Sequence, residues 1–318
     1  MNRKYLPVVA IICIMVITHM VALSVVNLYP SEYKAFGEDT DDPINPLIYV
    51  VFIILFTGAM LLVMKYTKGN FLQWAILAVV GLTLFYVFYP VFFHLFVNGL
   101  DWELLVGDRT ALLLALVMAV GLSYTLYKFP EWYIVDGVGM IMGAGIAAIF
   151  GFSLGILPVL VLLVVLAIYD AISVYKTKHM ISLASGVMKM KLPVLLVIPK
   201  KLDYSFFEQE GLEQVIDKKK KREAMFIGLG DIIIPGILPV SASIYLPAVS
   251  VGGFSGPVLV AVGAIIGAVC GLIALMRFVL KGNPQAGLPL LNSGVILGYL
   301  ITYYMVYQDL TFGINLNW

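Results

Sequence analysis

The stretch FIGLGDIIIPG, residues 226–236, places one carboxylate, that of Asp231, inside a run of apolar residues and glycines. The basic cluster KKKKR, residues 218–222, comes just before it. A charge at the centre of a bilayer costs at least about 2.5–3.5 kcal/mol, so ionisable residues in apolar spans usually face a cavity and act there. If this stretch crosses a membrane, Asp231 therefore needs a partner or a function.

The composition of the whole chain indicates a membrane protein. Of 318 residues 61% are hydrophobic and only 12% are charged, and the mean hydropathy is +0.99, whereas soluble domains average about 25% charged residues. Nine apolar runs approach or exceed the roughly 20 residues that cross a bilayer: 5–29, 47–65, 71–98, 109–128, 131–152, 155–175, 223–248, 255–280 and 285–308. We predict an all-α, polytopic membrane protein with nine transmembrane helices.

The distribution of Lys and Arg predicts the orientation. With the N-terminus on the cytoplasmic side, 18 of the 20 basic residues fall in inner segments, and only Lys34 and Arg109 fall outside. Basic residues accumulate on the cytoplasmic side of membrane proteins. The N-terminus is therefore predicted to be cytoplasmic and the C-terminus extracytoplasmic.

The predicted spans form one membrane domain with a single long insert. Residues 1–175 hold helices one to six, 176–222 form a cytoplasmic loop, and 223–318 hold helices seven to nine. The loop contains an extended-looking run, KLPVLLVIPKK (191–201), and a charged end, DKKKKR (217–222). We expect the charged end to lie among anionic lipid headgroups.

Three carboxylates fall within the predicted spans: Asp136, Asp170 and Asp231. Asp136 is close to the inner boundary of its span, and we expect it to lie at the interface. Asp170 lies six residues before Lys176, or about 9 Å at 1.5 Å per residue, and Asp231 lies about 13 Å beyond Arg222 by the same rise. Because spans six and seven run antiparallel, these depths allow Asp170 and Asp231 to meet.

The residues around Asp231 suit a site better than a plain span. Gly228 and Gly230 remove side-chain bulk, which allows close approach by a helix or a ligand. Pro235 lacks the N–H that would bond the carbonyl of Asp231, and Pro239 repeats the interruption. We expect a distorted helix beside an aqueous cavity, because broken helices are tolerated at membrane depth where water or neighbours satisfy the backbone.

Two carboxyl groups in contact cannot both ionise easily, so they share a proton. The ionised partner can then take a proton from water as the water attacks a carbonyl, while the protonated partner donates to the carbonyl oxygen. That is general acid–base hydrolysis without a covalent intermediate, as in soluble aspartic proteases. The titration belongs to the pair and not to either residue.

The motif YD at 169–170, with GLGD at 228–231 followed by IIIPG, resembles the GxGD intramembrane aspartyl proteases. Within that group the pattern is similar to presenilin and signal peptide peptidase, and the compact loops suggest an archaeal homologue. Type IV prepilin peptidases also carry GxGD, but with a lysine two residues on. Here Ile233 stands at that position, which disfavours them.

The resemblance implies an intramembrane aspartic endopeptidase with Asp170 and Asp231 as catalytic residues. It also implies roles in shaping the site for Tyr169, Gly228, Leu229 and Gly230. The family's Pro-Ala-Leu motif is matched approximately by a further set: Ala286, Gly287, Leu288 and the following Pro289. The resemblance implies no metal and no cofactor.

Its partners would be the lipid bilayer and protein substrates with transmembrane helices, including signal peptides, and no nucleic acid; a homo-oligomer stays open. A helical amide is protected, so the substrate must unwind before water reaches its carbonyl. KLPVLLVIP offers an edge for strand addition to the unwound segment. A loop that merely grazes the membrane is the alternative for this run. The natural substrate, the cleavage position and any accessory subunits are not readable from the sequence.

Competing interpretations use the same features differently. Two buried carboxylates also suit a proton-coupled transporter or channel, although the chain has no convincing internal repeat. A scaffold protein would use the small-residue stripes, which are Gly139, Gly143, Ala147 and Gly151, and then Gly263, Gly267 and Gly271. We expect these stripes to be helix-packing faces. GFSG at 253–256 matches the rhomboid serine motif, but no histidine follows it to act as a base, so we expect a turn.

Overall fold

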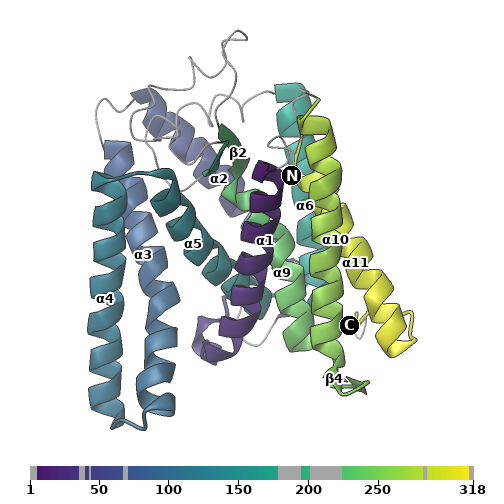
Figure 1. The fold of residues 1–318 in the computed structure, drawn as a ribbon, viewed down its shortest axis with the longest axis horizontal. Helices are drawn as coiled ribbons and strands as arrows, with labels where there is room; N and C mark the ends of the chain where they lie inside the picture. Colours follow the sequence, from purple (N-terminus) through teal and green to yellow (C-terminus); the bar gives the residue numbers. More distant parts are fainter. Residues whose placement is uncertain are drawn as a thin grey trace.

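The structure, a computed structural model, describes residues 6–35, 40–42, 44–66, 71–177, 195–200, 224–281 and 285–314. It is a helical bundle in which every predicted apolar run holds one helix (Figure 1). The helices are α1 (Leu6–Val25), α2 (Asn45–Tyr66), α3 (Phe71–Phe93), α4 (Leu104–Lys128), α5 (Trp132–Ser153), α6 (Ile156–Ile172), α9 (Leu229–Tyr245), α10 (Gly256–Val279) and α11 (Leu288–Tyr307). Short 3₁₀ or π turns are η1 (Val26–Leu28), η2 (Ser31–Tyr33), η3 (His94–Gly99) and η4 (Ser173–Thr177).

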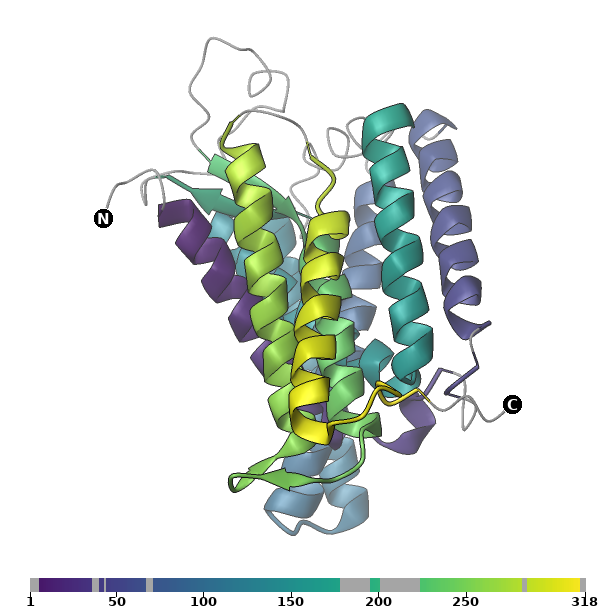
Figure 2. The ribbon, with the colours of Figure 1, turned by 90° about the vertical axis from the view of Figure 1, so that its right-hand side faces the viewer.

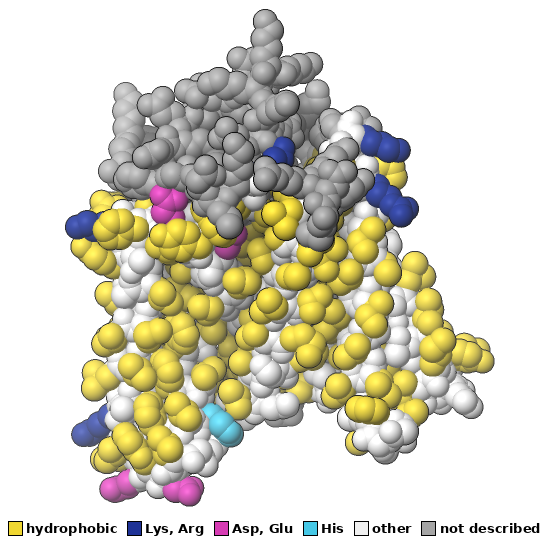
Figure 3. Space-filling view, in the orientation of Figure 1, with side chains coloured by type: hydrophobic (Ala, Val, Ile, Leu, Met, Phe, Trp, Pro, Cys, Tyr) yellow, Lys and Arg dark blue, Asp and Glu magenta, His cyan; other side chains and the backbone are white. Residues whose placement is uncertain are grey.

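The bundle has the surface of a multi-pass membrane protein. Within the described ranges, seven helical segments are long and apolar enough to cross a bilayer, and α9 is a shorter apolar helix. Figure 3 shows a broad hydrophobic band, with most Lys, Arg, Asp and Glu side chains on this face gathered toward its two ends. α1 begins at the end of the bundle that carries β2, and α11 finishes at the opposite end (Figures 1 and 2).

Helix α9, which carries Asp231, lies at the centre of the bundle. It packs against α1, α5, α6, α10 and α11. The hairpin of α3 and α4 forms one flank beyond α5, whereas α6, α10 and α11 form the other flank (Figure 1). The segment that begins with GLGD is therefore held from several sides by neighbouring helices.

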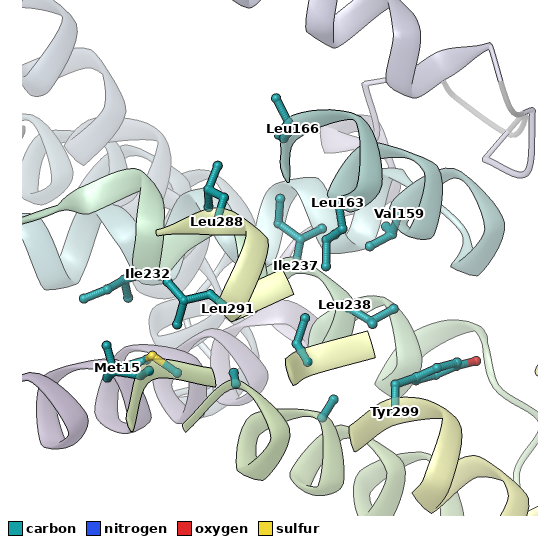
Figure 4. Packing of buried hydrophobic residues seen from close by; sticks show 14 of the residues in the cluster. Met15, Val159, Leu163, Leu166, Ile232, Ile237, Leu238, Leu288, Leu291 and Tyr299 are labelled. Carbon is teal, nitrogen blue, oxygen red and sulfur yellow. The ribbon is translucent and has the colours of Figure 1, made fainter. Parts of the chain in front are cut away.

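Buried side chains from α1, α6, α9 and α11 interlock beside this segment (Figure 4). Met15, Leu163, Ile232 and Leu291 have no measurable exposure, and Leu288 is also buried. Lipid tails are as apolar as these side chains, so van der Waals packing between the helices, rather than withdrawal from water, stabilises this arrangement. The same packing fixes the spacing of α6, α9 and α11.

The two small-residue stripes are packing faces, as predicted. On α5, a Cβ built on Gly143 would lie 3.4 Å from Ile233, and one built on Gly151 would lie 2.9 Å from the carbonyl oxygen of Ile237. On α10, a Cβ built on Gly267 would clash with the backbone of α11 at Gly294. Glycine therefore lets α5 approach α9, and α10 approach α11, almost backbone to backbone.

Two strands correct the predicted seventh span. Residues Leu195–Pro199 form β1, which pairs antiparallel with β2, Ala224–Gly228. The predicted run from 223 to 248 thus begins as a strand, and the helix starts only at Leu229. Glycine is a poor helix former, and the pairing with β1 supplies the backbone hydrogen bonds that a helix would have made. KLPVLLVIPKK is confirmed as extended over Leu195–Pro199, whereas DKKKKR lies outside the described residues.

The two prolines of the seventh helix do not end it. α9 runs without interruption through both Pro235 and Pro239. The carbonyl of Ile232, three residues before Pro235, accepts a hydrogen bond from the His19 side chain at 2.8 Å. Neighbouring helices also pack around α9 on several sides, and such surroundings make a proline tolerable inside a helix at membrane depth.

A second small sheet lies at the opposite end of the bundle from β2. β3 (Ser250–Val251) pairs with β4 (Phe254–Ser255), and the turn between them has positive φ at Gly252 (59°) and Gly253 (85°). Only glycine adopts such values readily. GFSG therefore lies in a hairpin turn, as predicted, and not in a serine-protease site.

Candidate active site

Asp231 lies in the first turn of α9. Gly228 ends β2 and is the N-cap of the helix, with φ −62° and ψ 135°, so Asp231 is the third helical residue. The backbone N–H of Gly228 donates a hydrogen bond to the Asp231 carboxylate. This is one half of a capping box, in which the side chain at the third position reaches back to the N-cap N–H. The GLGD motif thus places a carboxylate at the positive end of a helix dipole.

Asp170 lies near the end of α6 and is buried, with only 4% of its surface exposed. Its Oδ2 accepts the backbone N–H of Leu288 at 3.1 Å, and the backbone of Gly287 also donates to this carboxylate. Gly287 is the N-cap of α11. The second carboxylate is therefore also at a helix N-terminus, where unsatisfied N–H groups favour a negative charge.

The two carboxylates meet at Gly287. A Cβ built on Gly287 would lie 2.9 Å from both Cγ and Oδ2 of Asp231, while the backbone of Gly287 bonds Asp170. The two carboxylates are close enough to interact electrostatically. The predicted proximity of Asp170 and Asp231 is confirmed, and their common neighbour is the glycine of the AGLP segment.

The other predicted site residues divide into packed and open positions. Leu229, Ala286 and Leu288 are buried, so they hold the two helix N-termini in place. Gly230 is exposed, and among the described residues a Cβ built on it would meet only Ile234 Cδ1, at 3.9 Å. Gly230 is therefore the predicted residue that borders open space beside Asp231.

Two further predicted residues lie next to the carboxylates or to their backbone donors in the sequence. Tyr169 is half-buried and precedes Asp170 in α6, and Pro289 is half-buried in the first turn of α11. Within the part of the chain that the structure describes, no three His, Cys, Asp or Glu side chains come together as metal ligands would.

Asn292 connects the two helices that carry Asp170 and its backbone donors. Its side chain is 1% exposed, and its Nδ2 donates to the carbonyl of Leu163 at 2.7 Å. Asn292 is one turn beyond Leu288 on α11, and Leu163 is two turns before Asp170 on α6. This hydrogen bond therefore fixes α11 against α6 close to the site.

His19 is a site neighbour that the sequence did not reveal, because it stands alone in an apolar run. It is completely buried, and Nε2 is 2.8 Å from the carbonyl oxygen of Ile232, the residue after Asp231. A carbonyl only accepts, so Nε2 carries the proton. Gly236 leaves room for the imidazole ring, since a Cβ at that position would lie 2.8 Å from Nε2. His19 thus holds α9 immediately beyond the carboxylate.

A family model described as signal-peptide peptidase, presenilin aspartyl protease matches residues 11–307 of this chain. The chain belongs to this family. The match runs from within α1 to the end of α11 and includes both carboxylates, so the family assignment does not depend on the short GxGD motif alone.

Solved structures of relatives agree with the family assignment. The chain is similar to a presenilin family intramembrane aspartate protease in space group C222, with 33% identity, 94% of this chain and 100% of that chain covered, and a TM-score of 0.67. It is also similar to a presenilin family intramembrane aspartate protease in space group P2, with 34% identity, 95% and 99% covered, and a TM-score of 0.65. A comparison with curated proteins gave no match.

Proposed function

We propose that this protein is an intramembrane aspartic endopeptidase that hydrolyses peptide bonds in transmembrane helices or signal peptides, with Asp170 and Asp231 as its catalytic residues. The observation that carries the proposal is the meeting of the two carboxylates at Gly287, each at the N-terminus of a helix. Membership of a family of intramembrane aspartyl proteases supports it.

The proposed reaction is general acid–base hydrolysis of an amide. One carboxylate removes a proton from water as the water oxygen attacks the substrate carbonyl, and the protonated partner donates to the carbonyl oxygen. The tetrahedral intermediate then releases the amine, which receives a proton from the pair. The two helix N-termini favour the single negative charge that the pair carries in the resting state.

The substrate would reach the carboxylates beside Gly230. Gly230 has no side chain and its backbone is exposed, so it leaves room for a peptide next to Asp231. β2 ends at Gly228, three residues before Asp231, so an unwound segment pairing with this sheet would lead toward the site. The hydrogen bond from the Val197 N–H to Asp136, at 2.7 Å, occupies one donor of β1, which disfavours pairing along that part of KLPVLLVIP.

The orientation of the protein follows from the positive charges. We propose nine transmembrane helices with a cytoplasmic N-terminus and an extracytoplasmic C-terminus, because 18 of 20 basic residues then lie inside. Asp170 and Asp231 would lie toward the cytoplasmic end of the bundle, on the side of the 176–222 loop.

Reconstitution in liposomes tests the proposal against proton-coupled transport. The purified protein should cleave a co-reconstituted single-span substrate, and a hydroxyl-bearing transition-state analogue should inhibit the cleavage. A pH-sensitive dye in the lumen reports proton flux in the same vesicles. Proton flux that depends on Asp170 and Asp231, without cleavage of any substrate offered, would favour a transporter and contradict the proposal.

A further inference from the structure

Asp136 is a buried carboxylate that the proposed reaction does not use. It lies in the second turn of α5 with only 5% of its surface exposed, so it is buried among protein atoms. Its Oδ1 accepts the backbone N–H of Val197, in β1, at 2.7 Å. A buried N–H that is left without an acceptor costs about 1–3 kcal/mol. Asp136 thus fastens β1 to α5.

The hydrogen bond reaches β1 from its outer edge. In an antiparallel pair, residues that exchange ladder hydrogen bonds alternate with residues that do not. The Val197 N–H is directed to Asp136, so the pair Val197–Phe226 belongs to the second kind. The ladder bonds therefore run at Leu196–Ile227 and Ile198–Met225. Asp136 and β2 consequently hold β1 from opposite sides.

A close contact beside this hydrogen bond adds to the attachment. A Cβ built on Gly139, one turn after Asp136, would lie 2.9 Å from Leu196 Cδ2 and 3.6 Å from Leu229 Cδ1. Leu196 and Val197 are buried, with at most 1% exposed. Asp136 therefore bonds β1, and Gly139 leaves room for β1 and for the start of α9 to pack on α5.

The pairing of β1 with β2 connects β1 to the proposed active site. Leu195 pairs with Gly228, Gly228 is the N-cap of α9, and the Gly228 N–H bonds the Asp231 carboxylate. A displacement of β1 would therefore move Gly228, and with it the carboxylate that depends on its N–H. Each link in this chain is a backbone pairing or a hydrogen bond.

We propose that Asp136 is a positioning residue: its carboxylate fixes β1 on α5 and, through the β1–β2 register, sets the place of Asp231. The effect on cleavage rests on the proposed protease function, whereas the attachment of β1 does not. Asp136 acts as a hydrogen-bond acceptor, and an amide oxygen at the same position keeps that capacity. The proposal thus distinguishes Asp136→Asn, which retains the acceptor, from Asp136→Leu, which removes it.

Hydrogen exchange of the Val197 amide tests the attachment without any need for proteolysis. We expect slow exchange in the full-length protein and in Asp136→Asn, and exchange about 10-fold faster or more in Asp136→Leu, because the buried Val197 N–H then lacks its acceptor. Amides of α10 serve as an internal reference for global opening. Equal exchange of the Val197 amide in Asp136→Leu and in the unmodified protein would overturn the proposal.

Cleavage kinetics test the link to Asp231, and Val197→Pro removes the same hydrogen bond from the strand side. Asp136→Leu and Val197→Pro should each lower kcat about 10-fold with KM little changed, and the double variant should fall no further than the worse single variant. Ile198→Pro is the matched control. It places a proline at the neighbouring position of β1 and removes an N–H that bonds β2 rather than Asp136. The proposal would be overturned if the losses of kcat in Asp136→Leu and Val197→Pro added fully in the double variant. It would also be overturned if Asp136→Asn lost as much kcat as Asp136→Leu. If the unmodified protein cleaves nothing, the proposed function fails, and the exchange experiment still decides whether Asp136 holds β1.

Discussion

Replacing Gly230 by alanine separates a glycine needed for folding from one needed for substrate access. The described part of the chain leaves room at this position, since an added Cβ would meet there only Ile234 Cδ1, at the ordinary contact distance of 3.9 Å. Gly230 lies in the first turn of α9, where alanine is the better helix former by up to about 1 kcal/mol. The fold should therefore tolerate Gly230→Ala or gain slightly from it.

Activity should respond in the opposite direction. Under the proposed function the substrate reaches Asp231 beside the exposed Gly230, so an added methyl group would obstruct its approach, and a misplacement of about 1 Å can cost roughly 100-fold in rate. We therefore expect Gly230→Ala to retain its thermal midpoint, within roughly 2 °C of the unmodified protein. Its kcat/KM for cleavage should fall about 100-fold.

Two other glycines give matched controls for this experiment. Gly121 has no atom within 4 Å of a built Cβ and lies on α4, away from the site, so Gly121→Ala should change neither stability nor cleavage. Gly267 faces the α11 backbone, with Gly298 Cα at 2.9 Å from a built Cβ, so Gly267→Ala should lower the thermal midpoint. Cleavage by Gly230→Ala at the unmodified rate would refute the reasoning. So would a loss of stability like that of Gly267→Ala.

Two further predictions concern the neighbours and the charge of the pair. His19→Phe leaves the buried Ile232 carbonyl without its side-chain donor and should destabilise the protein by about 1–3 kcal/mol, measured by thermal unfolding in detergent. His19→Gln, which keeps an N–H donor, should lose less, and equal losses would contradict a hydrogen-bonding role. The rate of cleavage should follow a bell-shaped pH profile, because Asp170 and Asp231 work only while they share one proton. A rate that stays constant from pH 4 to pH 9 would contradict shared protonation.

The parts of the fold that could be predicted from sequence depend on patterns local to each segment. The apolar runs identified the helices because a bilayer requires about 20 apolar residues for each one. The proximity of Asp170 and Asp231 could be predicted from the helical rise, counted from Lys176 and Arg222. The glycine stripes on α5 and α10 identified packing faces, because small residues at that spacing permit close approach.

The parts that could not be predicted depend on contacts between distant segments. Nothing near His19 indicates that it meets the carbonyl of Ile232, 213 positions away. The start of the seventh helix was misplaced because β2 forms only through its pairing with β1. The hydrogen bond of Asp136 is not readable from its local sequence, because its donor is Val197, 61 positions along the chain. In each case a tertiary partner overrode what the local sequence indicated.

The most direct test of the central claim is cleavage of a transmembrane substrate in liposomes by the unmodified protein, Asp170→Asn and Asp231→Asn. Asparagine keeps the shape of each side chain and removes its ability to exchange a proton, so both variants should fold and bind substrate. The account predicts cleavage by the unmodified protein and the loss of detectable cleavage in each single variant. Full activity in either variant would show that the two carboxylates do not act as a catalytic pair.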